Sequence, residues 1–326
     1  MLEFGCALPQ DTADYGLIER VAKESEKLGF DSIWLYDHFY DPYGGTASDW
    51  TTSGGARPVP RNGPSYEIWT TLSALATVTS KIRLGTLTLC NSYRYPSVLA
   101  KMASTLDNIS NGRVEIGIGA GWFKEEFDAY GIPFTDADTR IACLREGVQI
   151  MKKMWTEENA TFKGKYYSIE SAYCAPKPIQ KPHPPIWIGG TVSAVMRVAA
   201  ELADGWNIAF YSSNTPAGFR KKVKRLERFC REIGRDPAKL RKSWHGEIVI
   251  GDSKTNVENK VEKLKPADMT LDQYRVGRII GTPDECIAQI ESYAKDGATY
   301  FMPRFPKVEG IEPIKLFAEQ VMAGLR

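Results

Sequence analysis

Apolar and polar residues alternate along the chain with two different periods, and each period predicts one kind of element. The clearest example is a short apolar run at 82–89, followed by a segment at 96–109 whose apolar residues fall at helical spacing. Alternating apolar residues follow at 114–119. Two strands joined by a crossover helix lie parallel, and parallel strands need helices over both faces. This segment therefore predicts the repeating unit of an α/β protein.

The same alternation continues over the rest of the chain. We expect about eight strands, at 2–8, 31–36, 82–89, 114–119, 186–188, 206–210, 242–251 and 299–302. We expect helices at 14–28, 67–79, 96–109, 139–155, 193–202, 216–233, 279–297 and 311–325. This alternation favours a closed (β/α)₈ TIM barrel over an open sheet.

Two segments interrupt the alternation. Residues 40–65 are rich in Gly, Pro, Ser and Thr and are long for a loop, which usually indicates a functional excursion. Residues 156–184 predict a small hairpin followed by a stiff, proline-rich run. We expect both to be insertions that shape a substrate pocket, within a single barrel domain that spans residues 1–326.

Composition excludes several classes of partner. The 42 basic and 40 acidic residues give a net charge of +2. This charge is too small to attract nucleic acid or an anionic membrane by overall electrostatics. The chain has neither a signal sequence nor an apolar run of membrane-spanning length, so we expect a cytoplasmic protein. Six dispersed cysteines and three isolated histidines lack metal-ligand spacing, so we expect reduced thiols and no metal site.

Three glycines precede an aromatic residue at the end of the fourth strand. Gly117, Gly119 and Gly121 suggest a dinucleotide fingerprint, but the position for its third glycine is Trp122, so the spacing fails. Small residues in a strand let either the barrel interior or a flat ligand come close to the backbone. We favour the ligand, because sites on α/β folds gather at the carboxyl ends of strands.

Six stretches, in this order along the chain, are similar to one known family. They are DSIWLYDHF (31–39), LGTLTL with YRYPSVLAKMASTLDNISNGR (84–113), GIGAGWFKEEFDAYGIPF (117–134), PPIWIGGT (184–191), ADGWN (203–207) and GTPDECIAQIESYAKDGATYF (281–301). The ordered set resembles the bacterial luciferase-like family of flavin and deazaflavin enzymes. The resemblance implies a TIM barrel with a redox cofactor at its carboxyl-end mouth. The sequence from Gly119 to Phe134 looks most like the branch of the family that uses coenzyme F420. The alternative cofactor is FMN.

The resemblance places a histidine of the deazaflavin enzymes at His38, which follows the second expected strand. A histidine can give or take the proton that accompanies hydride transfer, so we expect His38 to be catalytic. Asp37 would orient the imidazole or hydrogen-bond the deazaflavin ring. The alternative is a purely structural hydrogen bond between His38 and Asp37.

Two further segments are expected to bind the cofactor. Leu87-Thr88 aligns with a strand kink that contains a non-prolyl cis peptide in deazaflavin members of the family; the alternative is an ordinary trans strand. Gly189-Gly190-Thr191 opens a helix with an uncharged first turn, where free amides suit a phosphate. The alternative there is a tight turn with Thr191 as the helix cap.

The remaining candidates are less specific. We expect Gly119 and Gly121 to contact the cofactor. We expect Trp122 to line the substrate pocket. Glu125 and Glu126 are candidate acids or bases, but such a pair at a helix start is more often electrostatic decoration, and we favour that interpretation. An ion pair explains Arg304 as well as an anion contact does, and the basic helix at 220–231 is interpreted as a solvated face.

The sequence therefore predicts an oxidoreductase that transfers a hydride between F420 and a small organic substrate. An FMN monooxygenase, in which reduced flavin and oxygen form a peroxide, is the alternative within the family. A non-catalytic cofactor-binding protein is the alternative of another class. The resemblance also implies a homodimer.

Overall fold

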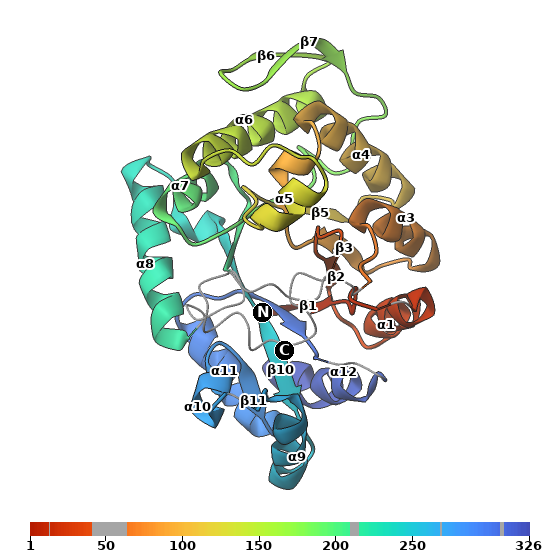
Figure 1. Ribbon diagram of the computed structural model, residues 1–326, viewed down its shortest axis with the longest axis vertical. Coiled ribbons are helices and arrows are strands. Elements are labelled where there is room, and N and C mark those ends of the chain that lie inside the picture. Colours follow the sequence, from red (N-terminus) through yellow and green to blue (C-terminus); the bar gives the residue numbers. More distant parts are fainter. Residues whose placement is uncertain (13, 41–63, 209–214, 268, 307–309) are drawn as a thin grey trace.

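Parallel strands close into a barrel that helices surround (Figure 1), in a computed structural model that describes residues 1–12, 14–40, 64–208, 215–267, 269–306 and 310–326. The barrel strands are β1 (Glu3–Ala7), β2 (Ser32–Leu35), β3 (Arg83–Thr86), β5 (Val114–Gly119), β8 (Ile186–Gly189), β9 (Gly205–Ile208), β10 (Arg241–Ile250) and β12 (Tyr300–Arg304). Each pairs with the next, and β12 pairs with β1. The predicted (β/α)₈ barrel is confirmed.

The outer helices form close to their expected bounds. They include α1 (Tyr15–Lys27), α3 (Ile68–Val78), α4 (Pro96–Ile109), α6 (Ala137–Thr156), α7 (Ser193–Leu202), α8 (Pro216–Glu232) and α11 (Pro283–Lys295). The last expected helix, 311–325, is divided into α12 (Glu312–Leu316), a π-helical segment (Phe317–Met322) and α13 (Ala323–Leu325). Each turns an apolar face to the strands, and α4 begins with proline at its first position, where the missing N–H costs nothing. None of the helices in the described ranges is long and apolar enough to cross a membrane.

Four elements differ from the expectation. β10 is long, and its carboxyl half pairs with a short strand β11 (Ile279–Gly281), where a helix was expected from residue 279 onward. α9 (Lys254–Leu264) and α10 (Leu271–Arg275) pack beside this extension, and α5 (Lys124–Ala129) forms within an expected turn. These elements are short or polar, so their periodicity is weak.

The predicted hairpin is confirmed as β6 (Asn159–Lys163) and β7 (Ser168–Tyr173), an antiparallel pair beyond α6 (Figure 1). Most of the other predicted excursion, residues 41–63, lies outside the described residues.

Large aromatic side chains fill the interior of the barrel because neighbouring strands carry glycine. Trp34 and Trp187 are buried there beside Tyr300. A Cβ atom built on Gly85 would lie 2.2 Å from the Trp34 indole, and one on Gly205 would lie 2.1 Å from the Trp187 indole. The interior of the barrel is therefore a packed core and not a pore.

Candidate active site

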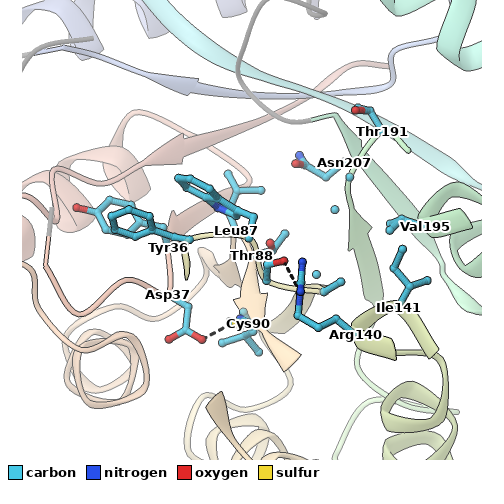
Figure 2. A pocket seen from close by; sticks show the side chains of 18 of the residues that line it. Tyr36, Asp37, Leu87, Thr88, Cys90, Arg140, Ile141, Thr191, Val195 and Asn207 are labelled. Carbon is cyan, nitrogen blue, oxygen red and sulfur yellow. Dashed lines mark hydrogen bonds between the residues drawn. The ribbon is translucent and has the colours of Figure 1, made fainter. Parts of the chain in front are cut away.

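A cavity of about 430 Å³ opens where the carboxyl ends of the strands meet (Figure 2). All ten residues predicted for the site line it: Asp37, His38, Leu87, Thr88, Gly119, Gly121, Trp122, Gly189, Gly190 and Thr191. Residues that the sequence analysis did not select also line it, among them Tyr93, Arg140, Asn207 and His245. Its size is that of a typical cofactor or small-molecule site.

His38 is held by Glu126, which the sequence analysis interpreted as decoration. The Glu126 carboxylate is fully buried, and its Oε2 lies 2.8 Å from Nδ1 of His38. It also accepts hydrogen bonds from the Phe39 amide, at 2.5 Å, and from the Tyr93 hydroxyl. The decoration interpretation is therefore wrong, because a carboxylate with these partners is part of the site. With Nδ1 committed to Glu126, Nε2 is the nitrogen available to a ligand.

Asp37 takes different partners from those expected. Arg94 donates to both carboxylate oxygens of Asp37, at 2.7 and 3.1 Å, and the Cys90 amide donates at 3.0 Å. Burial raises the pKa of the Asp37 carboxyl, and the charge of Arg94 opposes that rise. Arg94 also donates a hydrogen bond to the Glu67 carboxylate, at 2.7 Å between Nη2 and Oε1. The structure therefore gives Glu126, rather than Asp37, the orienting contact with His38.

The Leu87–Thr88 peptide is cis, so the trans alternative is wrong. It lies between β3 and β4 (Leu89–Cys90), which both pair with β5. Nearby glycines give this kink its space. A Cβ atom on Gly189 would lie 2.6 Å from the Thr88 side chain, and one on Gly117 would lie 2.0 Å from the Thr86 carbonyl oxygen. The kink itself therefore fills part of the space beside these glycines that was predicted to hold a ligand.

The turn before α7 has the features of an anion site. The N-cap residue is Val192 and no side chain caps the helix, so the alternative with Thr191 as the cap is wrong. The first amides of α7 keep their hydrogen-bonding capacity and the positive end of the helix dipole. Gly190 has φ +135°, a conformation that favours glycine, and it lines the cavity together with Thr191.

Arg140, on α6, brings a permanent positive charge to the same cavity. Its Nε donates to the Gly121 carbonyl oxygen at 3.3 Å, and its guanidinium lies 3.9 Å from the centre of the Phe134 ring. No carboxylate of the described residues forms an ion pair with it. Figure 2 shows Arg140 beside Ile141, on the side of Val195 of α7. Arg140 was not predicted as a site residue because it lies well after the end of β5.

Two aromatic side chains and one further histidine complete the walls. Trp122 is 44% exposed and stacks on Phe123 at 5.0 Å between ring centres. It forms a T-shaped contact with the His38 ring at 5.8 Å between ring centres. His245 was interpreted only as a strand residue, yet it lines the cavity from β10. Its alternation with Ser243 on the inner face of β10 was the signal that could have revealed it.

Other sequence expectations fall outside the cavity. Arg304 forms an ion pair with Asp11 at 2.7 Å, which is the simpler of its two interpretations. All six cysteines are free, and five of them are buried. No group of three His, Cys, Asp or Glu side chains in the described part of the chain could hold a metal ion.

Comparison with known proteins agrees with this architecture. A solved F420-dependent secondary alcohol dehydrogenase, in complex with an F420–acetone adduct, superposes with a TM-score of 0.82 at 22% identity over 99% of this chain and 98% of its own. The F420-dependent tetrahydromethanopterin reductase of Methanopyrus kandleri has a TM-score of 0.80 at 22% identity, over 100% and 99% of the two chains. At these identities the likeness establishes the fold.

Sequence relatives give the family. An F420-dependent glucose-6-phosphate dehydrogenase of Kineococcus radiotolerans is 28% identical over 95% of this chain and 93% of its own. Coenzyme F420 thus appears in the names of these relatives, in line with the branch expected from the sequence. The model of the luciferase-like monooxygenase family matches residues 2–275, so the chain belongs to that family, as predicted.

Proposed function

We propose that this protein is an oxidoreductase that transfers a hydride between coenzyme F420 and a small organic substrate. The observation that carries the proposal is the His38–Glu126 pair at 2.8 Å in the wall of the cavity. Three relatives named for F420-dependent enzymes, each matched over nearly the whole chain, support the choice of cofactor. Their named substrates differ, so the proposal leaves the substrate at the level of a small molecule.

The residues of the cavity fit a phosphorylated, ring-bearing cofactor. The uncapped start of α7 and the glycine pair before it would receive the phosphate, and Arg140 would add a cation that no described carboxylate neutralises. Asp37, the Leu87–Thr88 peptide, Gly119 and Gly121 would border the ring. When bound, the deazaflavin supplies the carbon that accepts or returns the hydride.

His38 would move the proton that accompanies the hydride. Since Glu126 accepts from Nδ1, a neutral His38 carries its proton on Nδ1 and presents the lone pair of Nε2 to the substrate. Protonation of Nε2 then leaves a cation directly against the buried carboxylate, which stabilises it. Tyr93 and the Phe39 amide hold Glu126 in place, so the imidazole keeps one orientation. Trp122 and Phe123 would keep water from the same face.

The test of the cofactor is a titration of the purified protein with F420 and, separately, with FMN, followed by an oxygen-electrode measurement. We expect tighter binding of F420, and substrate-dependent reduction of F420 without oxygen uptake. Oxygen consumption stoichiometric with product in the presence of FMN would replace this proposal with the FMN monooxygenase.

The phosphate position has its own test. Arg140→Gln should weaken F420 binding about tenfold, because a charge-assisted hydrogen bond becomes a neutral one. Gly190→Val is a poorer choice, since a side chain is strained at φ +135° and its Cβ would lie 3.0 Å from Val195. An unchanged affinity for F420 in Arg140→Gln would move the phosphate away from this arginine.

A further inference from the structure

Arg94 joins the wall of the cavity to the start of α3. It comes directly after the short 3₁₀ helix Asn91–Tyr93. Its guanidinium donates to both carboxylate oxygens of Asp37, at 2.7 and 3.1 Å, and to Oε1 of Glu67 at 2.7 Å. Glu67 is the N-cap residue of α3. Of these three residues only Asp37 lines the cavity, so Arg94 holds a residue of the site from outside it.

The pair of Asp37 and Arg94 is buried. The side chain of Asp37 is 2% exposed and that of Arg94 is 13% exposed. Two charges taken out of water cost free energy that apolar side chains in the same space would not. Oδ2 of Asp37 accepts from Arg94 and from the Cys90 amide (Figure 2), whereas Oδ1 accepts from Arg94 alone among the described residues. Since a carboxylate oxygen can accept two hydrogen bonds, Oδ1 retains the capacity to accept one from a ligand.

Arg94 opposes the protonation of Asp37. Burial raises the pKa of the Asp37 carboxyl, and the charge and hydrogen bonds of Arg94 are the main effects that lower it. The other titratable groups around the pair are those of His38, Glu67, Cys90, Tyr93 and Glu126. Apart from the imidazole, these groups are acidic or neutral. Removal of the arginine charge would therefore favour the protonated form of Asp37.

We propose that Arg94 is a positioning residue for the bound cofactor, because it holds Asp37 as an oriented carboxylate that accepts a hydrogen bond from a ring N–H or O–H. The inference rests on the proposed function, in which Asp37 borders the ring. A charged acceptor binds such a donor more tightly than a neutral acid does, and it repels ring oxygen atoms that can only accept. Arg94 thus acts on the cofactor through Asp37.

The experiment separates the charge of Arg94 from its bulk. Arg94→Gln removes the charge and keeps a donor, whereas Arg94→Lys keeps the charge but loses the planar fork. Glu67→Gln is the matched control, because it changes the other partner of Arg94, which does not line the cavity. Melting curves show that each variant is folded, and F420 fluorescence gives its dissociation constant between pH 6 and pH 9.

The expected signature is a dependence on pH. At pH 6 the dissociation constant of Arg94→Gln for F420 should be about tenfold that of wild type, because a charge-assisted hydrogen bond is lost. The ratio should fall as the pH is raised, since an Asp37 carboxyl with a raised pKa then ionises again. Glu67→Gln should match wild type at every pH, and any loss in Arg94→Lys should be independent of pH. Ratios to wild type cancel the titration of the cofactor itself.

Asp37→Asn shows whether Arg94 acts through this carboxylate. Asparagine does not ionise, so this variant should bind F420 about tenfold more weakly at every pH, and Arg94→Gln should add no further loss to it. The absorption of bound F420 then identifies the donor. A ring hydroxyl that titrates at a different pH in Asp37→Asn than in wild type assigns the O–H, and an unchanged titration assigns the N–H.

Two results would overturn the proposal and leave the proposed function standing. One is a folded Arg94→Gln whose ratio to wild type is the same at every pH, or whose loss adds in full to that of Asp37→Asn. The other is wild-type affinity for F420 in Asp37→Asn, which decides the matter even where Arg94→Gln does not fold. Failure of the wild-type protein to bind F420 or FMN would overturn both proposals.

Discussion

Each end of the barrel buries a carboxylate, but the basic partner is arginine at one end and histidine at the other. At the amino end Glu115 is fully buried and accepts hydrogen bonds from Arg83 and from the Trp187 indole, the latter at 2.5 Å. Arg241 lies 3.7 Å from the same carboxylate and covers the Trp187 ring at 4.7 Å. At the carboxyl end Glu126 is equally buried, yet its partner is the His38 imidazole.

This difference suggests a structural role for the contacts of Glu115 and a chemical role for that of Glu126. Arginine keeps its charge at all physiological pH values, so the pairs of Glu115 are permanent and close the bottom of the barrel. An imidazole can bind and release a proton, so the pair of Glu126 and His38 can take part in proton transfer. The contacts of Glu115 are therefore expected to stabilise the fold, and those of Glu126 to serve the reaction.

The largest effect is expected from His38→Ala. Loss of one general acid or base should lower turnover by about 10²–10⁴, and the pH dependence of turnover should lose one ionisation. Cofactor affinity should stay nearly the same, because the glycines and Arg140 are untouched. Single-turnover reduction of bound F420 and melting curves measure the two properties separately. A stable variant with normal turnover would remove His38 from the mechanism.

The matching change at the other end is Glu115→Gln. It leaves Arg83 and Arg241 beside a neutral group, and breaking such a buried pair should cost about 3 kcal/mol of unfolding free energy. Urea denaturation measures that cost, with Glu125→Gln on the surface of α5 as the control. Folded Glu115→Gln should bind F420 with wild-type affinity. Reduced affinity at equal folding would show that the two ends are coupled.

Sequence periodicity was sufficient for the barrel but not for its extension. The segment at 96–109 forms α4 with the expected bounds, since its apolar spacing and its proline both favour a helix. β11 could not be predicted in the same way. It is three residues long, and it forms because β10 extends past the barrel and offers it an edge. Such a strand depends on tertiary pairing and leaves little periodic signal.

The site was predictable only where a residue directly follows a strand. His38 follows β2, so both its position and its chemistry indicated a function. Glu126 is 88 residues from His38 in sequence, and it reaches His38 only because α5 folds back over the mouth of the barrel. An acidic residue in the first turn of a helix is usually favourable for the dipole alone, so local sequence gave no reason to prefer the site.

The two ends should also respond differently to pH. The pKa of His245 is lowered to about 4, whereas an unfolded histidine titrates near 6.5. Between these values the unfolded chain binds a proton that the native protein does not, so stability falls as pH is lowered through this window. The loss is up to about 3 kcal/mol. Urea midpoints at pH 7 and pH 5 measure the part of this loss above pH 5, about 2 kcal/mol.

His245→Phe supplies the control for that pH effect. This variant should lose less stability than wild type between pH 7 and pH 5, while Glu115→Gln should lose as much as wild type, because it leaves His245 in place. An equal loss in wild type and His245→Phe would assign the effect to other groups.

A smaller effect is expected from Glu126→Gln, which tests the comparison most directly. Glutamine keeps the volume of the side chain and an oxygen that can accept from His38 Nδ1, so the imidazole stays oriented. It lacks the charge that stabilises the protonated ring, and a charge-assisted hydrogen bond exceeds a neutral one by about 1–1.5 kcal/mol. We therefore expect kcat to fall about tenfold while the dissociation constant for F420 stays unchanged.

Tyr93→Phe is the matched variant for this carboxylate. It removes only the phenol hydrogen bond to Glu126 and leaves the charge in place, so its effect on kcat should be smaller than that of Glu126→Gln. If Glu126→Gln instead lost stability as Glu115→Gln does, with normal kcat in the folded fraction, the carboxylates at the two ends would both be structural. The distinction between the ends of the barrel would then rest on His38 alone.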